Sequence, residues 1–233
     1  MKQFNEVRKL QKATAVVLVL FAVVFVVIES SRPVLTGGSV TDQGMDYFED
    51  ELLVSENQNV NIEDPFMGEE NAPVTIMMFS DLKCGMCKYA WDNVIPEIER
   101  NYIESGKVKI VFKDFPLGFA TKEVKIAEAT HCAQEQGYYL EFLALVYENQ
   151  KELEVDGLAS LAEQAGLDTP QFTLCLESRK YTAKVRTDFE EGESLGMEGT
   201  PWFFVNEQEI RGAQPYPEFE RVIEEELLKL EGL

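Results

Sequence analysis

The sequence predicts an α/β domain in which a small mixed sheet is flanked by helices and interrupted by a helical subdomain, with a transmembrane helix in front. Three patterns indicate this: an uncharged apolar run at residues 13–28, a buried strand at residues 74–79 that leads directly into a helix, and helical patterns over residues 117–200. The length of 233 residues suits one or two domains. A formal net charge of −21 repels nucleic-acid phosphates, so we expect no nucleic-acid partner.

The N-terminal segment has the pattern of a membrane anchor. Residues 1–12 carry four basic residues against Glu6, a net charge of +3, and the next 16 residues carry no charge. As a helix this run is about 24 Å long, close to the roughly 30 Å hydrocarbon core of a bilayer. Residues 28–33 offer a poor cleavage site. We therefore favour an uncleaved anchor at residues 13–28 over a cleaved signal peptide, with a buried core helix as the third alternative.

The charges around this segment also predict the orientation of the chain. Basic residues before a span stay in the cytoplasm, so residues 1–12 would form a cytoplasmic tail of a single-pass protein of the cell membrane. The rest would lie on the extracytoplasmic side, where disulfides persist. The polar, acidic residues 29–60 are expected to form a tether to one domain at residues 61–233. The alternative is a docked helical extension built on Tyr47, Phe48, Leu52 and Leu53.

The first half of the domain places two cysteines at a strand-to-helix junction. Residues 74–79 form a continuous apolar run, which is typical of a central strand covered on both faces. Cys84 and Cys87 follow it, and apolar residues then recur at helical spacing as far as Tyr102. Pro96 lies inside this helix and should kink it, because proline removes a backbone donor.

The second half predicts a helical insertion followed by the end of the sheet. Residues 107–113 alternate between apolar and polar side chains, as a second strand does. Residues 202–211 predict a β-hairpin and residues 217–230 an amphipathic helix. Between them, the helical patterns cover residues 124–136, 139–149, 158–165 and a stretch that starts at residues 168–170.

The position of the cysteines predicts redox chemistry. Unpaired backbone N–H groups and the positive end of the helix dipole stabilise an anionic sulfur at a helix start. We expect Cys84 to be the exposed nucleophile and Cys87, one turn inward, to resolve the mixed disulfide that Cys84 forms. The pair could thus transfer two electrons.

Two other uses of a C-x-x-C motif are weaker. A zinc site needs two more ligands, and the candidates His131, Cys132 and Cys175 contain no second closely spaced pair. A purely structural bridge between Cys84 and Cys87 would close almost no loop. We therefore expect no metal and no bound cofactor.

Several separate motifs resemble the DsbA-like thioredoxin-fold disulfide oxidoreductases, which are membrane-anchored or secreted. They are Asp64-Pro65 through Gly68, Asn71-Ala72-Pro73-Val74-Thr75-Ile76, Phe79-Ser80-Asp81, Cys84-x-x-Cys87, Gly199-Thr200-Pro201 and Gly212-Ala213-Gln214-Pro215-Tyr216. The resemblance covers about residues 60–230 and implies a thioredoxin-like fold with a helical insertion. It also implies that Pro201 is a cis proline facing the cysteine pair, and that Thr200 offers its backbone to a bound peptide. Gly85 and Met86 complete the implied substrate-binding residues.

The sequence departs from this family in two places. Many thioredoxin relatives carry a buried acid six residues before the first cysteine, where this chain has Met78. Asp81 is the nearest carboxylate, with a turn-forming role as the alternative. The dipeptide Gly85-Met86 also lacks the histidine of the strongest oxidants, which leaves the oxidising strength open.

The other cysteines and the histidine are expected to be structural. A disulfide between Cys132 and Cys175 is the favoured interpretation, over two buried thiols or a second relay pair. His131 is expected on a helix surface rather than in catalysis. The aromatic residues expected in the core are Trp91, Tyr102, Phe203 and Phe204.

The predicted function is thiol–disulfide exchange through Cys84 and Cys87, in the direction that oxidises cysteines of reduced or unfolded extracytoplasmic proteins. The family resemblance implies a quinone-linked membrane redox partner, similar to DsbB or VKOR, that reoxidises the pair. A disulfide reductase or isomerase is the alternative of the same class. A peptide-binding or chaperone module without turnover is the alternative of another class.

Overall fold

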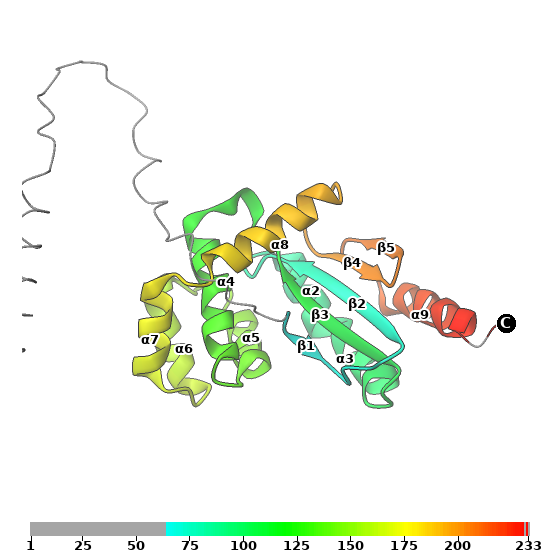
Figure 1. Ribbon diagram of the computed structural model, residues 1–233, viewed down its shortest axis with the longest axis horizontal. Coiled ribbons are helices and arrows are strands. Elements are labelled where there is room, and N and C mark those ends of the chain that lie inside the picture. Colours follow the sequence, from blue (N-terminus) through cyan, green and yellow to red (C-terminus); the bar gives the residue numbers. More distant parts are fainter. Residues whose placement is uncertain (1–63, 231, 233) are drawn as a thin grey trace, which may run out of the picture. The chain divides into compact units, whose positions relative to one another are not determined.

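The computed structural model describes residues 64–230 and residue 232 (Figure 1). The expected cytoplasmic tail, anchor and tether, at residues 1–12, 13–28 and 29–60, lie outside the described residues. Among the residues that are described, none of the helices combines the length and the apolar character needed to cross a membrane.

A five-stranded mixed sheet forms the centre of the domain, with the strand order β1-β3-β2-β4-β5. Strand β2 pairs in parallel with β3 and antiparallel with β4, and β1 and β5 add antiparallel edges. The strands are β1 (Phe66–Met67), β2 (Val74–Ser80), β3 (Val108–Asp114), β4 (Trp202–Val205) and β5 (Gln208–Arg211). The continuous apolar run thus forms a central strand, and the predicted mixed sheet with flanking helices is confirmed.

Strand β2 is buried on both faces because each face packs against helices. Ile76 and Met78 belong to the larger core, which includes residues of α2 (Gly85–Asn93), α3 (Ile95–Ile98) and α9 (Tyr216–Leu230). Phe79 belongs to a second cluster with Phe115, Met197 and Trp202, against which Phe189 of α8 (Thr182–Ser194) packs. Successive residues of a strand point to opposite faces, which explains the division.

The helix that follows the cysteines is interrupted, as Pro96 predicts. Helix α2 ends at Asn93, and α3 begins at Ile95 with Pro96 in its first turn, where a missing N–H costs no hydrogen bond. A π-helical turn, η1 (Glu99–Ile103), continues it. The kink separates the short helix that carries the cysteines from the part that packs on α9.

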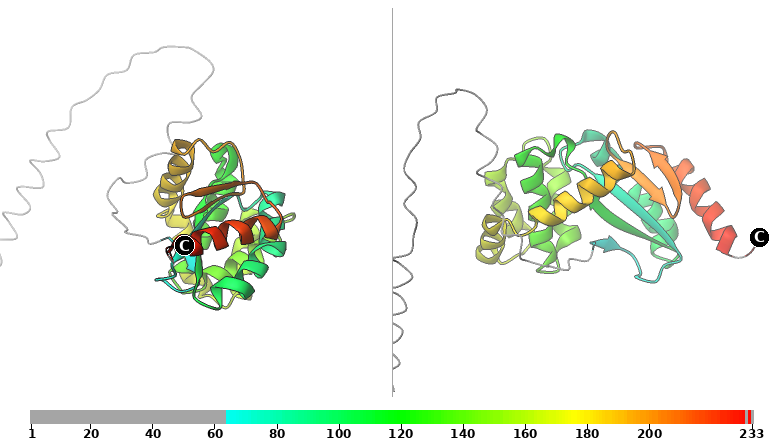
Figure 2. Two further views of the ribbon diagram at one scale, coloured as in Figure 1. Left: turned by 90° about the vertical axis from the view of Figure 1, so that its right-hand side faces the viewer. Right: turned by 45° about the horizontal axis from the view of Figure 1, so that its top comes forward.

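A helical insertion connects β3 to β4 (Figures 1 and 2). Its elements are η2 (Leu117–Phe119), α4 (Thr121–Gln134), α5 (Tyr139–Glu148), η3 (Val155–Gly157), α6 (Leu158–Gln164), α7 (Thr169–Ser178) and α8. Asp168 caps α7 by accepting the N–H of Gln171 at 2.9 Å, at the helix start that the sequence predicts. Cys132 of α4 and Cys175 of α7 form a disulfide bond.

The expected surface position of His131 is wrong. Its side chain is 1% exposed, because α4 is covered by α5, α7 and α8 rather than by one neighbour. Nine residues of α4, all but one of them consecutive, are buried, so the helix has no distinct polar face. Among the expected core aromatics, Tyr102 and Phe203 are buried, while Trp91 and Phe204 are partly buried against the core.

Candidate active site

The turn between β2 and α2 is held by Asp81. Its backbone carbonyl accepts the N–H of Cys84 at 3.0 Å, and its carboxylate accepts the N–H groups of Lys83 at 2.6 Å and Leu117 at 2.8 Å. The side chain is 3% exposed, and burial raises its pKa despite these two bonds. Asp81 therefore takes the turn-forming role and links the cysteine turn to the start of the insertion.

Cys84 is the residue that precedes the first turn of α2, and its sulfur is partly exposed. Hydrogen bonding from the Cys87 thiol lowers the pKa of Cys84 to about 5, with further help from the side chain of Thr200 and from the backbone N–H groups of Cys87 and Met86. These donors outweigh the partial burial of the sulfur, which acts in the opposite direction. Cys84 is therefore a thiolate at neutral pH.

Cys87 has the opposite environment although it lies only one turn further along α2. Its side chain is fully buried, and burial, together with the neighbouring Cys84 sulfur, raises its pKa well above the ordinary value. Cys87 remains protonated and donates to the thiolate of Cys84. The pair thus combines an ionised, accessible sulfur with a protonated, protected one.

The sheet brings a distant proline loop to the same place. Strand β4 runs antiparallel to β2 with Phe79 opposite Trp202, so the residues just before β4 lie at the end of β2 that leads to the cysteines. The peptide bond between Thr200 and Pro201 is cis. When protonated, the Cys84 thiol donates to the carbonyl oxygen of Thr200 at 3.4 Å.

Apolar side chains are exposed around the reactive sulfur. Gly85 has open space beside its Cα, and Met86 next to it is 52% exposed. Tyr89, on the next turn of α2, is 46% exposed, and Leu117, whose N–H binds Asp81, is 42% exposed. A surface of this kind can contact the apolar side chains of an unfolded chain.

The position of the acid found in many thioredoxin relatives is apolar here. Met78 is fully buried in the core. Sequence analysis missed three residues at this site. Lys83 belongs to the active-site turn and binds the backbone of Gln150, whose side chain binds the backbone of the turn, and Tyr147 interacts electrostatically with Cys87. No local pattern could reveal Tyr147 and Gln150, because they lie more than 60 residues along the chain and reach the turn only through the packing of the insertion.

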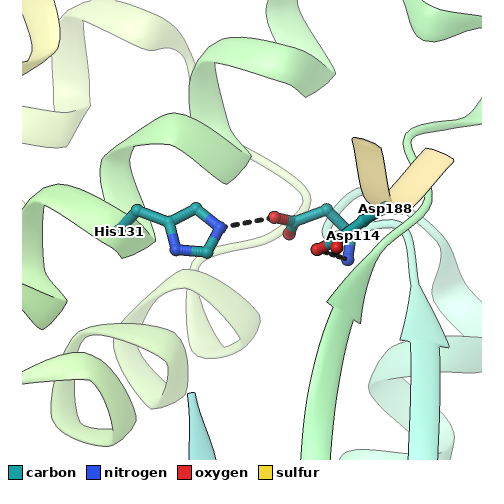
Figure 3. Close-up of side chains that lie close together, drawn as sticks. All are labelled: Asp114, His131 and Asp188. Carbon is teal, nitrogen blue, oxygen red and sulfur yellow. Dashed lines mark hydrogen bonds and ion pairs between the residues drawn. The ribbon is translucent and has the colours of Figure 1, made fainter. Parts of the chain in front are cut away.

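A cluster between the end of β3 and the insertion resembles a metal site in composition. Asp114, His131 and Asp188 lie together, with possible ligand atoms within 4.8 Å of one another (Figure 3). However, the Nε2 atom of His131 is bonded to Asp114 at 2.6 Å, and the Nζ atoms of Lys113 and Lys184 lie 3.3 and 2.5 Å from Asp188. The lysines already supply the positive charge, so this donor set fits a buried ionic network rather than a cation site.

The cysteines do not fit a zinc site either. Cys132 and Cys175 are used in a disulfide, which leaves only Cys84 and Cys87 as free thiols of the described chain. A structural zinc site takes four ligands.

The fold and the site define a dithiol oxidoreductase of the thioredoxin class, since a reactive cysteine at a helix start lies against a cis-proline loop at one end of a mixed sheet. A family model described as thioredoxin matches residues 60–225, so the chain belongs to this family. It catalyses thiol–disulfide exchange, as relatives with the name disulfide bond formation protein D indicate.

Known proteins of this class cover most of the chain. The probable disulfide bond formation protein D of Bacillus anthracis is 30% identical in an alignment 177 residues long, which covers 70% of this chain and 78% of that protein. The oxidised BdbD structure of Bacillus subtilis superposes with a TM-score of 0.65 at 25% identity, over 70% of this chain and 92% of that chain. The alpha-DsbA1 structure of Wolbachia pipientis gives a TM-score of 0.64 at 25% identity, over 72% and 94%.

Proposed function

We propose that this protein oxidises the cysteines of reduced or unfolded extracytoplasmic proteins. The observation that carries the proposal is the low pKa of Cys84, about 5, beside a protonated Cys87. Stabilising the thiolate favours the reduced form of the pair, and a stable reduced form makes the disulfide form a stronger oxidant. The relatives named as disulfide bond formation proteins support the same direction.

The proposed reaction starts from a disulfide between Cys84 and Cys87. A client thiolate attacks the sulfur of Cys84, the bond to Cys87 breaks, and Cys87 leaves and takes up a proton in its buried site. A second client thiolate then attacks the client sulfur of the mixed disulfide and releases Cys84 as a stable thiolate. The client loses two electrons and gains a disulfide, while the enzyme pair is reduced.

The positions of the active-site residues indicate which of them take part in catalysis and which bind the client. We assign Cys84, Cys87 and Pro201 to catalysis, because the proline loop lies against the reacting sulfur. Thr200 would pair its backbone with the client, and Gly85 and Met86 would contact client side chains beside Cys84. Cys132 and Cys175 would serve stability.

We also propose that residues 13–28 anchor the domain to the outer face of the cell membrane. The basic residues 1–12 support the orientation, and the disulfide in the insertion suits an oxidising compartment. A reduced Cys84–Cys87 pair needs a two-electron acceptor, and a quinone-linked membrane protein would be in reach of an anchored domain. This partner is the one that the DsbA-like family implies.

The test measures both activity and potential. Oxidised protein is mixed with reduced ribonuclease A, and disulfide formation is followed together with the equilibrium between the cysteine pair and glutathione. We expect oxidation of the client, loss of that activity in Cys84→Ser, and trapped mixed disulfides in Cys87→Ser. A reduction potential near that of thioredoxin, about −270 mV, would instead favour the reductase or isomerase alternative. Full activity of Cys84→Ser would contradict the catalytic role of Cys84, and a wild type that binds the client without oxidising it would favour a module without dithiol turnover.

A further inference from the structure

The segment that follows α5 and the turn that carries Cys84 are joined by hydrogen bonds in both directions. Gln150 lies two residues after α5, and its side chain is 5% exposed. Its amide nitrogen Nε2 donates to the carbonyl oxygens of Leu82 at 3.0 Å and Cys84 at 2.9 Å. One buried amide group of the insertion therefore binds the main chain of the active-site turn at two points.

The exchange also runs in the other direction. The Nζ atom of Lys83, between those two carbonyls in the sequence, donates to the carbonyl oxygen of Gln150 and to that of Leu153 at 3.1 Å. The cysteine turn and the segment after α5 thus each supply one side-chain donor and two backbone carbonyl acceptors. Four bonds of this kind fix one turn relative to the other more firmly than a single contact would.

The bond to Cys84 affects the geometry of the reactive residue directly. Its carbonyl oxygen accepts the N–H of Lys88 at 3.2 Å, which is the first backbone bond of α2, and Gln150 occupies the second acceptor position of the same oxygen. The orientation of this carbonyl is thereby fixed. The side chain of the same residue then faces the N–H groups of Met86 and Cys87, which point out of the helix start.

The same end of α5 also reaches the buried side of the pair. Tyr147, one turn before Gln150, is 1% exposed and stacks on Trp91 with a 5.3 Å separation of ring centroids. Its hydroxyl is hydrogen-bonded to Ser80 and lies within the electrostatic reach of Cys87. The insertion therefore contacts the surroundings of both cysteines through one helix end.

We propose that Gln150 is a positioning residue, assisted by Lys83, through which the helical insertion holds the Cys84 main chain so that its sulfur faces the start of α2. The inference rests on the proposed function only in taking Cys84 as the reactive sulfur. It does not depend on the direction of electron flow. The insertion thus contributes to the reactivity of the dithiol as well as covering it.

The test uses two variants of Gln150 and a neighbouring control. Gln150→Glu keeps the size but replaces the donor with an acceptor, and Gln150→Met removes the donor without adding charge. Asn149→Ala changes the adjacent exposed residue, whose amide bonds only to the carbonyl oxygen of Leu145 in its own helix. The readout is the pH profile of iodoacetamide alkylation at Cys84 in the reduced protein, followed by peptide mass spectrometry.

Both Gln150 variants should move the alkylation midpoint upward, because a freed Cys84 carbonyl no longer keeps the sulfur aligned with its donors. A shift of about one pH unit would lower the alkylation rate at pH 4 roughly tenfold. Asn149→Ala should retain the wild-type profile. The equilibrium constant with glutathione should change in the direction of a weaker oxidant in both Gln150 variants and not in the control.

Three results would overturn the inference. One is an unchanged Cys84 profile in both folded Gln150 variants, and another is a shift in Gln150→Glu alone, which would indicate an added charge and not lost positioning. If the Gln150 variants fail to fold, Lys83→Met removes the reciprocal bonds from a partly exposed side chain, and an unchanged profile there would be the third. Failure of the wild type to oxidise ribonuclease A would instead count against the proposed function and leave the alkylation test intact.

Discussion

Cys84 and Cys87 are separated by two residues, yet the domain gives their sulfurs opposite protonation states. Cys84 lies at the exposed end of α2 among hydrogen-bond donors, which lower its pKa to about 5. Cys87 lies inside the core, where burial raises its pKa well above the ordinary value. One turn of helix is therefore enough to separate a nucleophile from a protected, protonated thiol.

Alkylation of the reduced protein should separate the two sulfurs by pH. We expect Cys84 to react with iodoacetamide with a midpoint near pH 5, since the thiolate is the reacting species. Cys87 should stay largely unmodified below pH 9, both because it is protonated and because it is buried. Peptide mass spectrometry at a series of pH values measures each site, and a midpoint for Cys84 near that of an ordinary thiol would contradict the assignment.

The lowered pKa of Cys84 should also make the reduced protein more stable at neutral pH than in acid. A group whose pKa is lower in the folded state contributes stability above its unfolded pKa, and this contribution is lost as the pH falls through the folded value. For Cys84 the loss runs from about pH 8.5 down to pH 5. We expect a contribution of about 2 kcal/mol at pH 8, below the full linkage value because solvent screens the partly exposed sulfur.

Urea unfolding of the wild type and of Cys84→Ala, both in the same reductant, measures this contribution. The difference between them should shrink between pH 8 and pH 4. A difference that stays constant over that range would contradict the linkage. The raised pKa of Cys87 changes the stability only at pH values above the ordinary thiol pKa, so it does not affect the comparison between pH 8 and pH 4.

At the residue scale, the sequence could predict what lies close along the chain. Cys84 at the start of a helix follows from the strand pattern before it and the helical spacing after it. The partners from the insertion, such as Gln150, could not be predicted because they depend on tertiary packing. His131 was misplaced for the same reason, since a helix covered on several sides carries no periodic polar face.

At the element scale, the disulfide between α4 and α7 should contribute strongly to stability. It joins residues 43 apart in sequence, for which the chain-entropy model predicts about 4 kcal/mol. The double variant Cys132→Ala/Cys175→Ala should lower the free energy of unfolding in urea by about this amount. A decrease below about 1 kcal/mol would mean that the packing of the insertion alone holds the two helices together.

The elements with strong local signals are those that the sequence predicts well. The central strand, the break at Pro96 and the helix start at Asp168 each follow from a few neighbouring residues. Strand β1 is only two residues long, and its pairing with β3 is set by tertiary contacts, so no periodicity could reveal it. Helix α8 was not separated from the other helical patterns of the insertion, since it was predicted only as part of residues 117–200.

At the scale of the whole domain, a buried ionic network joins the sheet to the insertion. Lys113 of β3 and Lys184 of α8 each lie within 2.7 Å of Asp64, and both also contact Asp188. Asp188 accepts the backbone N–H of Asp114 at 3.2 Å, and Asp114 in turn binds His131 of α4. Opposite charges were visible in the sequence, but pairs such as Asp64 with Lys184 join segments far apart along the chain and depend on the tertiary fold.

His131 should make the stability of this network depend on pH. Burial acts to lower its pKa, but the carboxyl group of Asp114 outweighs burial, so the pKa of His131 is raised above the ordinary value. A group with a raised folded pKa stabilises the protein below its unfolded pKa, about 6.5, and this stability is lost as the pH rises through the folded value. We therefore expect His131→Gln to lower the free energy of unfolding most at pH 5 to 6, by about 3 kcal/mol, and less at alkaline pH.

This measurement should use the oxidised protein, because a disulfide between Cys84 and Cys87 removes the opposite pH dependence that the Cys84 thiolate would add. Urea unfolding of the wild type and His131→Gln from pH 5 to pH 9 gives the difference directly. Asp114→Asn is the matched control, since it removes the carboxyl group that raises the pKa of His131 and should abolish most of the same pH dependence. If the cost of His131→Gln is constant across this range, the histidine contributes by packing against Tyr181 and Tyr139 and not through its charge.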